Sequence, residues 1–123
     1  MAVYFNIEEM TKSETASKKG IKNEIPNIVT FCNALKVLER LDLVRAHIDK
    51  PIHINSGYRC KELNKAVGGA ENSYHTKGLA VDFRTYRKED IPKMYSFLQR
   101  NIKQFGIQEL IKYDTFIHMA IKP

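Results

Sequence analysis

The sequence predicts an α+β fold in which helices pack against a small antiparallel sheet. Two long segments, 28–41 and 91–102, repeat apolar residues at the spacing of an amphipathic helix. Two shorter segments, 52–55 and 79–83, alternate apolar and polar or small residues as half-buried strands do. The C-terminal stretch 107–121 contains two strand-like segments around a polar turn, which is typical of a β-hairpin.

The N-terminal part of the chain is predicted to be helical. Asn6 followed by Glu9 is a typical helix start, and this short helix should end near Thr15. Gly20 interrupts the next segment. A longer helix is expected to begin after Asn27, because apolar residues then recur at helical spacing. Its predicted apolar face consists of Ile28, Phe31, Leu35, Leu38 and Leu41.

Strands and helices alternate in the rest of the chain. In the first strand, Ile52 and Ile54 should lie on one face and His53 on the other. A second substantial helix should begin near Ile91 and end near Gly106. In chain order we predict a strand at 52–55, a turn at 56–59, a short helix at 61–67, a strand at 79–83, a helix from 91, and a hairpin of 107–112 and 115–121 that turns at Tyr113 and Asp114.

Length and composition indicate one domain, residues 1–123, with a modest core. No apolar run is long enough to suggest a membrane span. The first residues lack both a basic leader and an apolar stretch, so we expect no secretory signal and synthesis in the cytoplasm. A substrate outside the cytoplasm would then be reached through lysis, particle assembly or another export route.

The net charge of +6 suggests an anionic partner, either nucleic acid or an acidic cell-wall polymer. The basic residues are scattered and form no stripe interleaved with aromatic residues. We therefore expect no nucleic-acid partner. We also expect a monomer.

Two histidines and one aspartate stand out as a possible metal site. Strand alternation places Asp82 on the face opposite Leu79, Val81 and Phe83, among small residues that leave room for an ion. His118 should lie on the polar face of the last strand, where it can meet Asp82. With His75, these residues would complete the protein ligands of a catalytic zinc that keeps one position open. Each residue alone is more typical of a loop or strand position without a metal, and their joint placement favours the metal site.

An ordered set of motifs resembles the zinc D-Ala-D-Ala carboxypeptidase family, peptidase family M15, subfamily A. The resemblance covers about 52–121 and is closest to the short bacteriophage and bacterial type, with the fold shared by D-Ala-D-Ala carboxypeptidases and hedgehog-like domains. The matching residues are Asn55-Ser56-Gly57-Tyr58-Arg59, Leu63-Asn64, Val67-Gly68-Gly69, Ser73-x-His75-x-x-Gly78-x-Ala80-x-Asp82 and Phe116-Ile117-His118.

The resemblance implies a function for several residues. His75, Asp82 and His118 would bind Zn²⁺, and Arg59 would stabilise the oxyanion that develops at the scissile carbonyl. Ser73 would bind substrate or orient His75, although capping of its own loop is an equal alternative.

The general base is harder to place. The family commonly supplies an acid or a histidine two or three residues before the last zinc histidine, where this chain has Phe116 and Thr115. Asp114 could replace it if the hairpin turn brings its carboxylate over the metal, or it could be an ordinary turn residue. Glu109 falls opposite His118 if Tyr113 and Asp114 form the turn, and there it would act as the base or fix the His118 tautomer.

We therefore expect a zinc-dependent peptidase that cleaves peptidoglycan stem peptides or cross-links, as a carboxypeptidase or an endopeptidase. The alternative is a zinc-bearing module that binds the cell wall without turnover, which the missing acid before His118 favours. A basic nucleic-acid binder ranks third.

Overall fold

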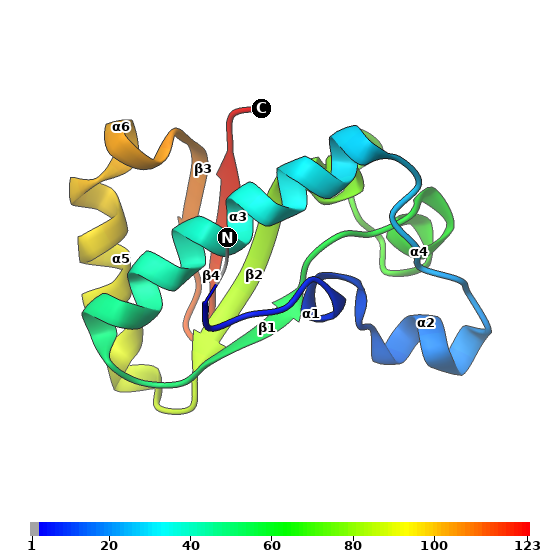
Figure 1. Ribbon diagram of the computed structural model, residues 1–123. Coiled ribbons are helices and arrows are strands. Elements are labelled where there is room, and N and C mark those ends of the chain that lie inside the picture. The colour runs from blue at the N-terminus through cyan, green and yellow to red at the C-terminus, as the bar shows by residue number, and fades with distance from the viewer. Residues whose placement is uncertain (1–2) are drawn as a thin grey trace.

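The computed structural model describes residues 3–123 and contains one four-stranded antiparallel sheet with the strand order β1-β2-β4-β3 (Figure 1). This architecture confirms the predicted α+β class. The strands are β1 (Ile52–Ser56), β2 (Ala80–Thr85), β3 (Ile107–Lys112) and β4 (Ile117–Ile121). The helices are α1 (Glu8–Thr11), α2 (Glu14–Lys19), α3 (Ile28–Ile48), α4 (Lys61–Ala66), α5 (Ile91–Arg100) and α6 (Ile102–Phe105), with short 3₁₀ turns η1 (Tyr74–Lys77) and η2 (Lys88–Asp90).

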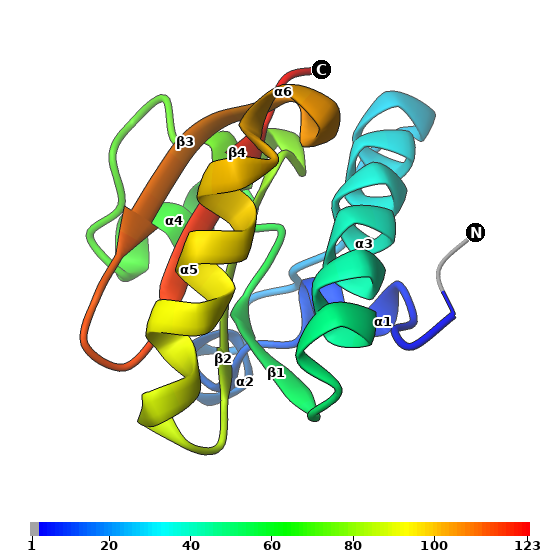
Figure 2. The ribbon, with the colours of Figure 1, turned by 90° about the vertical axis from the view of Figure 1, so that its left-hand side faces the viewer.

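Helices α3 and α5 cover one face of the sheet and leave the other for the candidate site (Figure 2). The covered face contributes alternate strand residues to a single buried cluster, including Val81 and Phe83 of β2 and Met119 of β4. Because side chains alternate across a strand, Asp82 and His118 point to the opposite face. No helix in the described part of the chain is long and apolar enough to cross a membrane.

Helix α3 begins where the sequence predicted, with the Asn27 side chain accepting a hydrogen bond from the Thr30 backbone N–H (2.9 Å). Its predicted apolar face is only partly right, because Ile28 is 70% exposed. Leu38 and Leu41 belong to the predicted and to the observed buried face. The prediction is therefore wrong by a rotation of the buried stripe about the helix axis. The buried apolar residues of α3 are Ala34, Val37, Leu38, Leu41 and Val44.

Two of the predicted helices are interrupted. In the N-terminal segment, Asn6 and Glu9 exchange side chain–backbone hydrogen bonds as a capping box, as the sequence indicated (3.1 and 3.3 Å). The chain then becomes extended at Lys12, and Ser13 caps a separate helix α2. The helix predicted to run to Gly106 is likewise divided, at Asn101, into α5 and α6.

The C-terminal hairpin turns one residue later than predicted. The Tyr113 N–H donates to the Phe116 carbonyl (2.9 Å), so the turn is centred on Asp114 and Thr115. Lys112 therefore pairs with Ile117, and Ile111 rather than Glu109 lies opposite His118. From Glu109 to Lys112 the register differs from the prediction by two residues, and a shift of two leaves these side chains on their predicted faces. Glu109 consequently remains on the same face as His118, but diagonally across from it.

Candidate metal centre

Three separate elements bring His75, Asp82 and His118 together. His75 belongs to η1, Asp82 to β2 and His118 to β4, where Asp82 and His118 form a direct cross-strand pair. One potential ligand atom from each residue lies within 4.8 Å of the other two. The structure thus assembles the three residues that the sequence singled out as metal ligands.

His75 is buried, and its two ring nitrogens face different groups. The Gly57 carbonyl oxygen lies 2.6 Å from Nδ1 and can only accept, so Nδ1 carries the proton. Nε2 of the neutral ring is then an acceptor, and it has no hydrogen-bond partner among the described residues. It lies 3.3 Å from Oδ1 of Asp82, another acceptor. Two atoms that each direct a lone pair at the same buried space fit a bound cation. An imidazole nitrogen and a carboxylate oxygen are ligands that zinc accepts.

Local hydrogen bonds fix the loop that carries His75. The Ser73 hydroxyl accepts from the His75 backbone N–H (3.2 Å) and caps η1. Gly78 ends η1 in the left-handed conformation with φ 74°, and a Cβ there would lie 2.8 Å from the Thr30 carbonyl oxygen of α3. Ser73 therefore orients the His75 loop, and a contact with substrate stays a prediction.

Asp82 and His118 form a close hydrogen-bonded pair. Oδ1 of Asp82 lies 2.7 Å from Nδ1 of His118. Burial alone would raise the pKa of Asp82, but the hydrogen bond from His118 and the contact with His75 outweigh it and lower the pKa to about 2. Burial tends to lower the pKa of His118, yet its bonds to Asp82 and Glu109 raise it above the ordinary value. The Asp82 carboxylate is therefore anionic at any physiological pH and could serve as a metal ligand.

Glu109 and Asp114, the two predicted candidates for the general base, lie in different surroundings. Oε1 of Glu109 is 2.8 Å from Nε2 of His118, the ring nitrogen that faces away from Asp82. Asp114 is exposed on the hairpin turn and is not among the residues that line the cavity at the three ligands. Glu109 is thus the carboxylate that the fold brings to the site.

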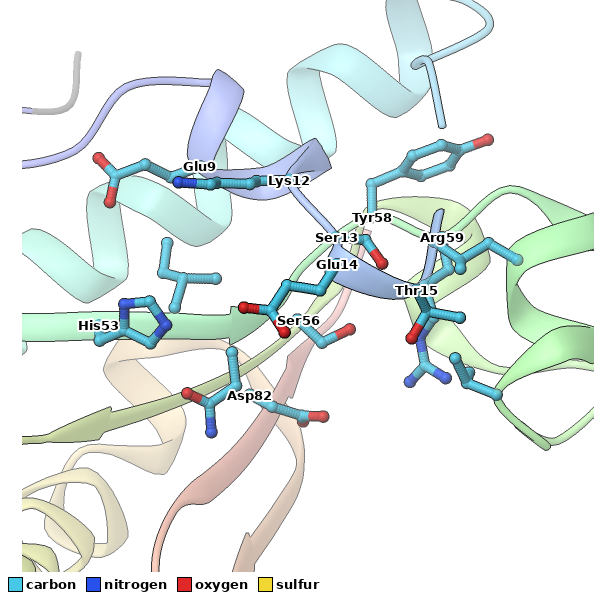
Figure 3. Close-up of a pocket in the computed structure, with 14 residues that line it drawn as sticks. Glu9, Lys12, Ser13, Glu14, Thr15, His53, Ser56, Tyr58, Arg59 and Asp82 are labelled. Atoms are coloured by element: carbon cyan, nitrogen blue, oxygen red, sulfur yellow. The ribbon is translucent and has the colours of Figure 1, made fainter. Parts of the chain in front are cut away.

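Arg59 lies beside the three candidate ligands. Its backbone N–H donates to the His75 carbonyl (3.1 Å), and its side chain lines the same cavity as Asp82 (Figure 3). Burial lowers the pKa of Arg59, while the negative charge of Asp82 opposes this shift. Gly69 leaves room for the guanidinium, since a Cβ there would lie 2.8 Å from Nη1 of Arg59. A cation is thereby held next to the site without an ion-pair partner within 4 Å among the described residues.

The cavity at His75, Asp82 and His118 has a volume of about 350 Å³ and an aromatic wall. Tyr113 and Phe116 stack with ring centroids 4.5 Å apart, and both line the cavity with Tyr74 and Asn72. Sequence reasoning did not assign these four residues a function. The backbone pairing of Tyr113 with Phe116 across the turn explains the stack, and correct placement of the turn would have revealed it.

Comparison with known proteins identifies the family. The sequence profile of the family described as Peptidase M15 matches residues 3–120. The chain belongs to the peptidase M15 family. The match spans most of the chain and confirms the family resemblance inferred from the motifs.

Among curated proteins, the zinc D-Ala-D-Ala carboxypeptidase of Streptomyces albus G is 47% identical to this M15 chain over 51 residues. That alignment covers 41% of the chain and 20% of the Streptomyces protein. The chain therefore matches only a small part of this relative's length.

Proposed function

We propose that this M15 protein is a zinc-dependent peptidase that acts on peptidoglycan stem peptides or cross-links in the bacterial cell wall. The observation that supports it most is the buried Nε2 of His75, which faces Asp82 with no hydrogen-bond partner among the described residues. The name of the Streptomyces relative supports both the metal and the substrate class.

The proposed mechanism assigns one task to each residue. His75, Asp82 and His118 hold the metal, and zinc in such a site supplies a Lewis acid that polarises a carbonyl and increases the acidity of water. Arg59 donates hydrogen bonds to the oxyanion that forms as the peptide carbonyl is attacked. Its lack of an ion-pair partner leaves the guanidinium available for this contact.

Glu109 is the better placed of the two candidates for proton transfer. A general base must come within hydrogen-bond reach of the proton that it removes, directly or through one water. Glu109 lines the cavity at the ligands, whereas Asp114 does not. One oxygen of Glu109 orients His118, and the other is available to accept a proton. We therefore propose Glu109 for both functions and an ordinary turn position for Asp114.

The test is incubation of the zinc-loaded protein with purified muropeptides, followed by chromatography of the products. Release of D-alanine would indicate a carboxypeptidase, and cleaved cross-links would indicate an endopeptidase. His75→Ala should abolish both the activity and stoichiometric zinc binding. His47→Ala is the matched control, because this histidine stacks on Phe97 at the end of α3 and does not line the cavity. An unchanged muropeptide profile would refute the proposed activity.

A zinc-bearing cell-wall-binding module is the second candidate. It is favoured by Thr115 and Phe116, which replace the acid that the family commonly carries before the last histidine. In that case the zinc-loaded protein would sediment with purified peptidoglycan and leave its muropeptides intact.

A further inference from the structure

A second, larger cavity of about 660 Å³ adjoins the metal centre (Figure 3). It shares Arg59 and Asp82 with the cavity at the proposed ligands, so the two spaces meet at a proposed metal ligand and at the arginine proposed to bind the oxyanion. Strand β1 contributes His53 and Ser56, and the segment 9–15 forms the opposite wall. A peptide whose scissile carbonyl lies at Arg59 would therefore extend into this second cavity.

The N-terminal wall is firmly attached to the site. The Tyr58 N–H donates to the Met10 carbonyl at 2.6 Å. The Asn23 amide donates to the carbonyls of Thr11 (2.9 Å) and Tyr58 (2.8 Å), and its oxygen accepts from the Cys60 N–H (2.7 Å). These bonds attach the N-terminal segment to Tyr58 and Cys60, the two residues that flank Arg59. Residues before β1, outside the stretch that resembles the family motifs, thus help to shape the binding cleft.

In the wall formed by residues 9–15, the carboxylate of Glu14 is the charged group that points into the cleft. In Figure 3 its carboxylate points toward β1, between His53 and Ser56, while the Lys12 side chain runs toward Glu9. Within residues 3–123, no hydrogen bond or ion pair is formed by the Glu14 side chain. The Arg59 guanidinium enters the cavity from the other end. The cleft therefore presents a cation beside the metal centre and an unpaired anion farther along.

We infer that the cavity between Arg59 and Glu14 binds the part of the substrate peptide next to the scissile bond, and that Glu14 selects a side chain ending in an ammonium group. This inference rests on the proposed function, since it takes the ligand to be a peptide held at the metal centre. A carboxylate recognises an ammonium group through charge-assisted hydrogen bonds. Because Glu14 is exposed to solvent, the preference should be moderate.

The test compares two synthetic stem peptides that differ only in whether the side-chain amine is free or acetylated. Calorimetry on the zinc-loaded protein should show about two- to five-fold tighter binding of the free amine. Glu14→Gln should abolish this preference and leave the affinity for the acetylated peptide unchanged. Glu14→Lys should reverse the preference through charge repulsion. Glu8→Gln is the matched control, since it removes the same charge from α1 outside the cavity and should keep the preference.

The outcomes separate this inference from the proposed activity. No preference in the wild-type protein, or a preference that survives in Glu14→Gln, would overturn the inference even if muropeptides are cleaved. A preference that disappears in Glu14→Gln and persists in Glu8→Gln would support the inference even if no cleavage is detected, because binding is measured without turnover.

Discussion

His118 has a carboxylate at each ring nitrogen, Asp82 at 2.7 Å and Glu109 at 2.8 Å. A neutral imidazole donates from only one nitrogen, so the two contacts favour the protonated ring and raise the pKa of His118 above 6.5. Zinc binding at the proposed site would have to displace this proton. We expect zinc affinity to be constant above the raised pKa, and protonation of His118 to lower it about tenfold per pH unit below that value.

Competition titrations of zinc with a chromophoric chelator at several pH values would measure this dependence. Asp82 should add no further loss until the pH approaches its own pKa of about 2. The interpretation would be wrong if zinc affinity were unchanged from alkaline pH to well below the ordinary pKa of histidine.

Glu109→Gln separates the two functions proposed for Glu109. The glutamine carbonyl can still accept a hydrogen bond from Nε2 of His118, so zinc binding should be retained. The amide cannot take up a proton, and kcat should fall by about 10²- to 10⁴-fold. Steady-state kinetics together with zinc analysis of the same sample would show both effects.

Asp114→Asn is the matched control, since it makes the same chemical change on the exposed turn of the hairpin. It should leave kcat and zinc content unchanged. Full activity in Glu109→Gln would exclude Glu109 as the base, and loss of activity in Asp114→Asn would transfer that assignment to Asp114.

At the level of elements, Gly57 connects α1 to the metal centre. Its carbonyl accepts from His75, and a Cβ at this position would lie 2.6 Å from the carbonyl oxygen of Met10. Gly57→Ala must therefore displace either α1 or the carbonyl that orients His75. We expect the free energy of unfolding to fall by about 1–3 kcal/mol and zinc affinity to fall with it. Denaturant unfolding and zinc titration would check this, and wild-type values for both would contradict the close approach.

The sequence predicted the elements better than their exact ends. The face on which a strand residue lies depends on alternation alone, so the sequence is enough to place Asp82 and His118 on one face of the sheet. The register of the hairpin depends on which residues form its turn, and neither Tyr113-Asp114 nor Asp114-Thr115 contains the glycine that would mark the turn. The cleft wall at 9–15 could not be predicted, because its position depends on long-range bonds such as those of Asn23.

At the level of the whole molecule, one face of the sheet forms the hydrophobic core and the other bears the candidate site. Helices α3 and α5 and the apolar strand residues form the core on one face. The other face bears the polar site, bordered by the N-terminal segment and by the connection 57–79 between β1 and β2. Substitutions on the site face should therefore change binding or activity more than stability.

Zinc is the expected exception, because its proposed ligands join η1, β2 and β4 and thereby close the connection 57–79 onto the sheet. A ligand that binds only the folded state stabilises it by about 2.7 kcal/mol when its free concentration is 100 times Kd. For a domain of this size, such a gain should raise Tm by roughly 10 °C. Thermal unfolding with zinc and after removal by a chelator would measure the difference. His75→Ala should abolish the response and His47→Ala should keep it, so an equal zinc response in both variants would contradict a metal centre at His75, Asp82 and His118.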